Sequence, residues 1–172
     1  MQKWSEVTRE ERFFTAMLFQ AVMKDPGPMT DFLRSTFGFS EGVRIVDVGY
    51  EVCYFRDAWL VRLIQNRQSS LEHQTFDLVF WLSDGSMVIV EAKAQQAFDT
   101  KQVQKLKDAR PILLKERCAK EVLLLGLHSS NYHPTTASSG FDKCLAWNDL
   151  VQAGIYPTMA AHFSRADSIY RQ

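Results

Sequence analysis

Cysteine is scarce and scattered in this chain of 172 residues. The three cysteines, Cys53, Cys118 and Cys144, lie far apart, are odd in number and form no Cys-x-x-Cys pair. Because structural zinc sites and disulfide frameworks need paired or closely spaced cysteines, neither is expected. Thiols that stay reduced are typical of the cytoplasm, so we expect a cytoplasmic protein.

An excess of charge and long hydrophobic runs are also missing. Lys plus Arg and Asp plus Glu number 20 each, so the formal net charge is zero. A zero balance neither indicates nor excludes a nucleic-acid partner, because only a local basic patch would matter. The apolar run at residues 122–127 is far too short to span a bilayer. The charged start of the chain does not resemble a signal peptide, and we expect no membrane contact.

The composition is that of a folded domain. Hydrophobic residues make up 46% of the chain and aromatic residues 12%, fractions that are too high for a disordered segment. The length fits one α/β domain with its own core and leaves no room for a second domain of normal size. We therefore predict a single domain over residues 1–172, with a core at about 8–155 and a C-terminal tail at 156–172.

Helix and turn signals organise the first half of the chain. Thr8 and Glu11 fit a capping box at the start of a helix. Apolar residues then recur at helical spacing until residues 25–28, Asp-Pro-Gly-Pro, stop the helix. The other elements expected here are a helix at 30–37, strands at about 43–55 and 59–64 with a turn near 56–57, and a polar loop at 65–74. The tryptophans expected in the core or the sheet are Trp4, Trp59, Trp81 and Trp147.

Strands and helices alternate in the second half. Two strands at residues 75–82 and 86–94 form a predicted hairpin, and the apolar run at 122–127 is typical of a strand covered on both faces. The other expected elements are a helix at 100–109 capped by Asp99, a loop at 129–140, a short strand at 143–146, a helix at 148–153 and a helical tail from 158. This order predicts an α/β fold with a mixed central β-sheet flanked by helices.

The register of the hairpin decides whether Asp77 and Glu91 share a face. A two-residue Asp84-Gly85 loop would pair Asp77 with Ala92 and place the two acids on opposite faces. A three-residue loop that starts at Ser83 pairs Asp77 with Glu91 and puts Gly85 where φ must be positive. We predict this second register, whose other pairs are Val79–Ile89, Trp81–Met87, Leu78–Val90 and Phe80–Val88.

Asp77, Glu91 and Lys93 would then gather at one end of an otherwise apolar hairpin. Like charges opposite each other on a sheet are unfavourable, and a divalent cation would give them a reason to cluster. Mg²⁺ takes carboxylate and carbonyl oxygens, here from Asp77, Glu91 and Ala92. Lys93 would stand beside the metal to orient or deprotonate water and to neutralise charge at phosphorus. The competing interpretation is a salt bridge between Lys93 and an acid at the strand end.

An acid on one strand followed by Glu91-Ala92-Lys93 on the next resembles the PD-(D/E)xK nuclease superfamily. Asp77 matches the first acid of that pattern, and Phe76 stands where the family name expects proline. The resemblance implies a restriction-endonuclease-like fold and metal-dependent hydrolysis of DNA, less often of RNA. It also implies Mg²⁺ as the cofactor, with Mn²⁺ able to substitute.

Two further residues enter through the same resemblance. The family carries a glutamate on its first helix, which matches Glu11, with Glu10 as the reserve. Many members place a glutamine on the helix after the lysine, which matches Gln102. Both positions have a structural alternative: Glu11 would serve a capping box equally well, and capping next to Asp99 is the favoured explanation for Gln102. Lys101, Lys105 and Lys107 share that helix and are expected on a solvated face.

Three functional hypotheses follow. The first is a Mg²⁺-dependent DNA endonuclease, with a homodimer as the simplest way to cut both strands and a partner protein to supply targeting. The second is a non-catalytic nucleic-acid-binding or assembly module on a nuclease fold. The third is an RNA nuclease, which a requirement for the 2′-hydroxyl would distinguish. Carboxylates held in internal ion pairs with no cavity beside them would favour the module.

Overall fold

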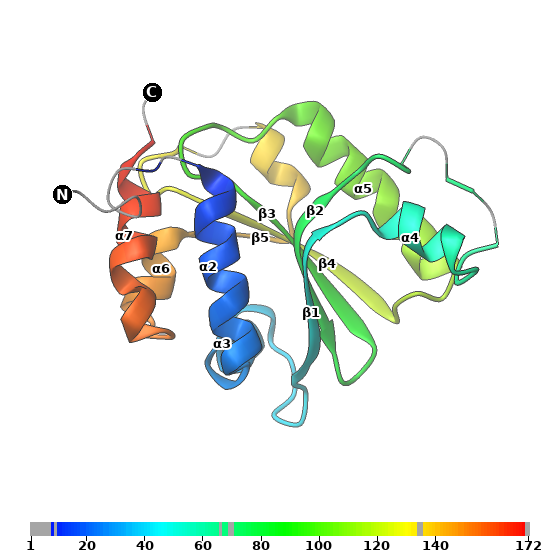
Figure 1. Ribbon diagram of the computed structural model, residues 1–172, viewed down its shortest axis with the longest axis horizontal. Coiled ribbons are helices and arrows are strands. Elements are labelled where there is room, and N and C mark those ends of the chain that lie inside the picture. The colour runs from blue at the N-terminus through cyan, green and yellow to red at the C-terminus, as the bar shows by residue number, and fades with distance from the viewer. Residues whose placement is uncertain (1–7, 9, 66, 69–70, 134–135, 171–172) are drawn as a thin grey trace.

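Five strands form one mixed β-sheet in the computed structural model, which describes residues 8, 10–65, 67–68, 71–133 and 136–170 (Figure 1). The strands are β1 (Ile45–Val52), β2 (Phe76–Leu82), β3 (Ser86–Ala92), β4 (Glu121–His128) and β5 (Lys143–Ala146). They lie in the order β1-β2-β3-β4-β5, antiparallel from β1 to β3 and parallel from β3 to β5. The predicted α/β class with a mixed sheet is confirmed.

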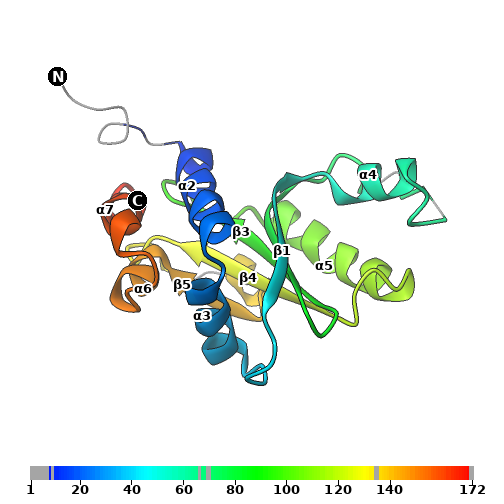
Figure 2. The same cartoon turned by 60° about the horizontal axis from the view of Figure 1, so that its bottom comes forward.

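Helices cover both faces of this sheet, as Figure 2 shows. They are α2 (Glu11–Lys24), α3 (Gly27–Phe37), α4 (Tyr54–Leu60), α5 (Thr100–Lys115), α6 (Trp147–Gln152) and α7 (Ala160–Ser168), with the 3₁₀ turns η1 (Thr136–Gly140) and η2 (Pro157–Met159) between them. One face packs with α2, α3, α6 and α7, and the other packs with α4 and α5. The central strands are apolar on both sides because both sides are covered.

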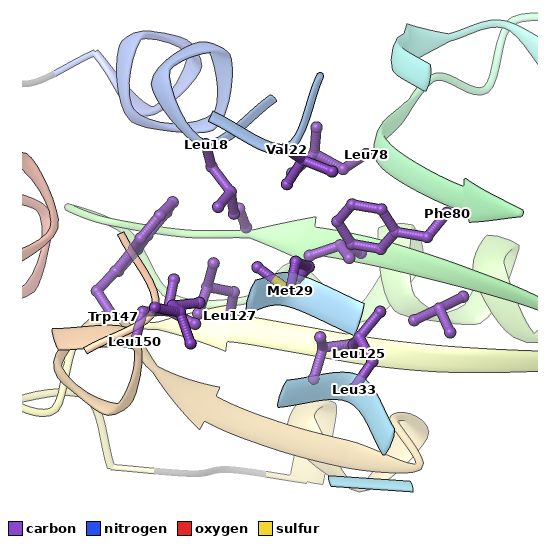
Figure 3. Packing of buried hydrophobic residues seen from close by; sticks show 14 of the residues in the cluster. Leu18, Val22, Met29, Leu33, Leu78, Phe80, Leu125, Leu127, Trp147 and Leu150 are labelled. Carbon is purple, nitrogen blue, oxygen red and sulfur yellow. The ribbon is translucent and has the colours of Figure 1, made fainter. Parts of the chain in front are cut away.

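Strand alternation divides the hairpin residues between the two hydrophobic clusters. Figure 3 shows Leu78 and Phe80 of β2 pointing into the same space as Leu18 and Val22 of α2. Val79, which lies between them in sequence, belongs to the cluster on the α5 side. Phe80 is 1% exposed, and burying a side chain of this kind contributes roughly 1.5–3 kcal/mol. The hairpin is therefore anchored in both layers of the fold.

The predicted register of the hairpin is confirmed for four of its pairs, whereas the expected Asp77–Glu91 pair lies just beyond the ladder. The pairs Leu78–Val90, Val79–Ile89, Phe80–Val88 and Trp81–Met87 all form. The strands end at Leu82 and resume at Ser86, which leaves the predicted three-residue loop. Gly85 has a φ of 85°, and its N–H donates to the carbonyl of Leu82 at 3.0 Å. The turn thus takes the left-handed residue that the sequence offers for it.

The strand predicted at residues 59–64 is wrong. Residues 54–60 form α4 instead, so the turn predicted near 56–57 lies inside a helix and β1 ends at Val52. Phe55 and Ala58, three residues apart, are both buried on the inner side of α4. Leu60, Val61 and Leu63 are exposed. The run of apolar residues resembles a strand, but only helical spacing brings the buried Phe55 and Ala58 to the same face.

Two helices run further than predicted, and proline accounts for both differences. Helix α3 begins at Gly27, because Pro28 fits the first turn, where the missing N–H has no partner to lose. Helix α5 continues through Pro111 to Lys115. An exposed proline inside a helix costs about 3 kcal/mol, and here it is offset by Leu113, which is fully buried on the far side of it.

The segment expected as a tail is part of the core. Helix α7 packs against α2 and α6, and its Phe163 and Ala166 are buried. Trp147 is also fully buried and stacks on Phe163, whereas Trp59 is 36% exposed. Trp4 and parts of the two predicted loops lie outside the described residues. No helix within the described ranges is long and apolar enough to cross a membrane.

Candidate active site

The strands β2 and β3 separate at the end of the hairpin that lies away from the turn. Their ladder stops at the Leu78–Val90 pair. Beyond it, the N–H of Ala92 donates to Oδ2 of Asp77 at 2.8 Å. In a continued antiparallel ladder that N–H would meet a backbone carbonyl. The Asp77 carboxylate therefore takes over a backbone position and is fixed there. We refer to this region, with Asp77, Glu91 and Lys93, as the open end of the hairpin.

Glu91 and Lys93 form a buried ion pair at the open end. Nζ of Lys93 donates to Oε1 of Glu91 at 2.6 Å, and the two side chains are 12% and 1% exposed. Oε2 of Glu91 is buried and has no hydrogen-bond partner among the described residues. The salt bridge that competed with the catalytic interpretation is thus present. It leaves one carboxylate oxygen unsatisfied, which costs free energy in a buried site.

Burial at the open end raises the pKa of both carboxyl groups of the hairpin. Burial raises the pKa of Glu91 to about 8, and the carboxylate of Asp77 adds to the rise, while Lys93 acts against it. Burial also raises the pKa of Asp77, although the Ala92 N–H and Lys93 both oppose that change. Burial lowers the pKa of Lys93, but the surrounding carboxylates outweigh it and the net direction is upward. A group of acids held against their ordinary ionisation is typical of functional sites.

Helix α2 brings Glu11 to the same place. Oε1 of Glu11 accepts from the backbone N–H groups of Ala94 and Gln95 at 3.3 and 3.4 Å. Its Oε2 lies 3.8 Å from Nζ of Lys93. Glu11 therefore holds the chain directly after β3 and lies near the same lysine as Glu91. The reserve residue, Glu10, is exposed.

The predicted capping box at the start of α2 is wrong. The helix begins at Glu11 with Glu10 as its N-cap, and no side chain caps it. Oγ1 of Thr8 accepts from the N–H of Glu10 at 3.2 Å, one turn too early to cap the helix. Because Glu11 stands at the first helical position, its side chain is free of capping and reaches the hairpin. Of the two explanations offered for Glu11, the structure shows the contact with the open end.

Gln102 is capped through its backbone, and the capping role favoured for its side chain is not seen among the described residues. Oδ1 of Asp99 accepts from the backbone N–H of Gln102 at 3.0 Å, so the predicted N-cap of α5 is confirmed. The side chain of Gln102 lines a cleft of about 460 Å³ beside the open end. Lys101 and Lys105 of the same helix are exposed, as expected for a solvated face, and they line the cleft too.

This cleft joins predicted residues from α2, β2, the end of β3 and α5. Glu11, Asp77, Lys93 and Gln102 all line it, whereas Glu91 lies beneath Lys93 and does not. Residues that the sequence analysis did not select line it as well: Arg12, Glu51, His73 and Gln74. Nothing in the local pattern marks them, because they reach the cleft through the pairing of β1 with β2 and the position of α2.

Glu51 is the clearest of the missed residues. Its φ is 52°, a left-handed conformation that is unfavourable for a residue with a side chain. Its Oε1 lies 3.3 Å from Nε of Arg12. The strained backbone directs an acid at the end of β1 into the cleft, where its charge helps to raise the pKa of Asp77. Strain of this kind concentrates at functional sites.

The donor set at the open end fits a hard divalent cation in kind. Its donors are carboxylate oxygens, which Mg²⁺ prefers, and Oε2 of Glu91 is a buried oxygen still lacking a partner. Among the described residues, however, no three or more Asp, Glu, His or Cys side chains stand together ready to hold a metal ion. The ammonium of Lys93 lies against Oε1 of Glu91, where a cation would bind. Binding at Oε1 would therefore require Lys93 to move away from Glu91, whereas Oε2 is without a partner among the described residues.

The cleft is lined by both acidic and basic side chains. Arg12 is paired with Glu51 and Lys93 with Glu91, while Lys101 and Lys105 form no ion pair with any residue in the described ranges. Such an arrangement can hold an anionic group against a cluster of carboxylates only if a further cation or proton bridges them. Comparisons of the chain with protein-family models, with curated proteins and with solved structures return no match.

Proposed function

We propose that this chain is a metal-dependent nuclease of the PD-(D/E)xK type, with a restriction-endonuclease-like fold, and that DNA is its first candidate substrate. The observation that carries the proposal is the convergence of Glu11, Asp77, Glu91 and Lys93 beside one cleft from two strands and a helix. The order α2, β1, β2, β3, α5 and β4, with α3 before β1 and α4 between β1 and β2, also supports the proposal.

Asp77, Glu91, Glu11 and the carbonyl of Ala92 are the groups that would hold Mg²⁺ or Mn²⁺. When bound, the ion would supply polarisation of the phosphate and a water of lowered pKa. Its positive charge would also offset the burial that raises the pKa of Glu91. The ion would also compete with the ammonium of Lys93 for the carboxylate of Glu91, so that Lys93 would be freed to act in the cleft that it lines.

The remaining residues would position the substrate. Lys93, once released from Glu91, would orient the attacking water and neutralise charge that develops on the phosphate. Gln102 would hydrogen-bond the water or the phosphate from α5, and Lys101 and Lys105 would hold neighbouring phosphates from the same helix. Cutting of both strands would be simplest in a homodimer, and targeting would fall to a partner protein.

Cleavage assays on supercoiled plasmid, linear duplex, single-stranded DNA and RNA test this proposal. The protein is incubated with Mg²⁺, Mn²⁺ or EDTA, and the wild type is compared with Asp77→Asn and Lys93→Met. Asp77→Asn keeps an oxygen to accept from Ala92, so the loss of charge is tested without loss of the bond. We expect metal-dependent cutting that falls by about 10³-fold or more in both variants. Wild-type protein that cuts none of the substrates would contradict the proposal.

One observation favours the second candidate, a non-catalytic nucleic-acid-binding module. Glu91 forms an ion pair with Lys93 and does not line the cleft, as expected for a site that has lost its catalytic activity. The cleft beside the ion pair speaks against it, because the module was expected to lack one. Nucleic-acid binding without turnover by the wild type would identify the module. Cutting that needs the 2′-hydroxyl would identify the RNA nuclease.

A further inference from the structure

Gln74 is the least satisfied polar side chain in the cleft. It lies just before β2 and is 7% exposed, and it lines the same cleft as Asp77. Both Oε1 and Nε2 of its amide are buried without a hydrogen-bond partner among the described residues. By contrast, Nε2 of Gln104, on the outer side of α5, donates to Asp108 at 2.8 Å. Leaving both ends of a buried amide unpaired is costly, so the side chain is suited to meet a ligand.

The amide needs a partner that both donates and accepts. A phosphate group offers only acceptors and would leave Oε1 of Gln74 unpaired. The edge of a nucleobase offers both kinds of group, and the N6 amino group and N7 of adenine are the pair that a glutamine amide meets with two bonds. The chemistry of Gln74 therefore fits a base, and adenine best.

The recessed position of Gln74 decides the form of the nucleic acid. In a duplex the base edges lie at the bottom of a groove, and a side chain must project from the protein to reach them. Gln74 does the opposite, since it lies at the wall of a cleft of about 460 Å³. A base can reach it only by entering the cleft, which a single strand permits and a stacked duplex does not.

The neighbours of Gln74 place the phosphates of the same strand. Lys101 and Lys105, one turn apart on α5, line the cleft and can hold the backbone of an entering strand. Gln74 precedes Asp77 by three residues, so their Cα atoms are at most about 11 Å apart. A base held by Gln74 would therefore lie close to the phosphate at the open end.

We propose that Gln74 binds the edge of an unpaired adenine base in the cleft, so that the protein prefers adenine-containing single-stranded nucleic acid. The assignment deepens the proposed nuclease function and rests on it only for the reaction at the neighbouring phosphate. Gln74 acts as a specificity residue and takes no part in bond breaking. Its amide must turn from its buried position toward the base as the base enters.

Fluorescence anisotropy with labelled single-stranded oligo(dA), oligo(dC), oligo(dT) and oligo(A), in EDTA to prevent cutting, tests this assignment. The wild type is compared with Gln74→Met, which keeps the length of the side chain, and with Gln104→Met as the matched control. We expect the wild type to favour the adenine oligomers, and Gln74→Met to bind them about 10-fold more weakly with no remaining base preference. Gln104→Met should bind as the wild type does. A preference for oligo(A) over oligo(dA) would name RNA as the source of the base.

Thermal unfolding of the same proteins separates binding from folding. Gln74→Met should melt at the wild-type temperature or above it, because an unpaired buried amide is replaced by an apolar group. Weaker binding without loss of stability is a result that a purely structural glutamine would not produce. A wild type without base preference, or a Gln74→Met variant that retains one, would overturn the assignment.

A parallel cleavage assay with Mg²⁺ keeps the two proposals distinct. If the wild type and Gln74→Met both cut and neither prefers a base, the role of Gln74 is rejected and the nuclease proposal stands. Adenine-selective binding that Gln74→Met abolishes, in a protein that cuts nothing, would support the role of Gln74 and reject the nuclease.

Discussion

At its turn, the β2–β3 hairpin is held by a continuous backbone ladder and apolar side chains, whereas at its open end side chains replace the backbone partners. Met87, near the turn, is fully buried and pairs with Trp81. At the other end the ladder has stopped, and Asp77 accepts the N–H of Ala92 in its place. The same two strands thus carry a stabilising end and an end occupied by buried charge.

The two ends of the hairpin differ in what they contribute to the stability of the fold. Packing at the turn lowers the free energy of the fold at each position. At the open end, Glu91 is buried with an unpaired oxygen, Glu51 has a left-handed backbone, and Gln74 has an amide without partners. Each of these features costs stability, and they meet around one cleft. Function is the physical reason that would keep them there.

The largest expected effect is a change in the pH dependence of stability in Glu91→Gln. The pKa of Glu91 is raised from 4.5 to about 8 by burial, so its neutral carboxyl stabilises the fold below pH 4.5 and that contribution is lost as the pH rises through 8. As the pH rises from 4.5 to about 8, the free energy of unfolding of the wild type should therefore fall relative to that of Glu91→Gln. The difference should change by up to about 1.4 kcal/mol per pH unit. Urea unfolding in EDTA measures it. Parallel pH profiles would show that Glu91 ionises freely in the fold.

Met87→Ala should break the turn end without touching the open end. Truncating this fully buried side chain leaves a cavity and should lower the free energy of unfolding by about 3 kcal/mol. Cleavage per folded molecule, measured well below the melting temperature, should equal that of the wild type. Met23→Ala, at a position that is 59% exposed, is the control and should change stability by less than about 0.5 kcal/mol. Loss of cleavage in fully folded Met87→Ala would show that packing at the turn also controls the activity of the open end.

Glu11→Gln should lower cleavage by about 100-fold, as expected for the loss of a charge that supports a metal site. The amide keeps an oxygen for the N–H groups of Ala94 and Gln95, so the fold should be retained. Glu10→Gln is the matched control, because Glu10 is exposed and does not line the cleft. Initial rates in Mg²⁺ give the comparison. Equal losses in both variants, or a loss only in Glu10→Gln, would reject Glu11 as the helix carboxylate.

The smallest expected effect is at the turn itself. Gly85→Ala should cost about 1 kcal/mol of stability, because Gly85 has a φ of 85° and alanine is unfavourable there. An added Cβ would meet its nearest neighbour, Cβ of Lys120, at 3.5 Å, so strain and not collision sets the cost. Gly42→Ala, where neither strain nor a neighbour opposes a side chain, should leave the melting temperature unchanged.

The hairpin could be predicted from the sequence because its determinants are local. The loop Ser83-Asp84-Gly85 and the alternation on either side of it suffice to predict the four observed pairs and to bring Asp77 and Glu91 to the same end of the hairpin. Helix α4 could not be, since residues 54–64 carry apolar letters that suit either period, and only the buried pair of Phe55 and Ala58 distinguishes them. The last residues of α5 could not be predicted either, because tertiary burial of Leu113 outweighs the local helix breaker Pro111.

The cleft could be predicted only in part. Glu11 and Gln102 were selected through a family resemblance, while their local sequence favoured caps equally or more. Glu51 and Gln74 carry no local signal, because they meet Asp77 only after β1 pairs with β2 and the chain before β2 folds back. The Lys93–Glu91 contact was predicted as the alternative to catalysis. In the structure the ion pair and the cleft occur together.

Single-turnover cleavage by the wild type, Lys93→Met and Met87→Ala, each in Mg²⁺ and in EDTA, tests the central claim most directly. The preferred substrate of the wild type is used for all three proteins. The claim that the open end is a metal-dependent phosphodiesterase site predicts cutting by the wild type and Met87→Ala in Mg²⁺ alone, and none by Lys93→Met. Cutting by Lys93→Met at the wild-type rate, or cutting that persists in EDTA, would contradict it.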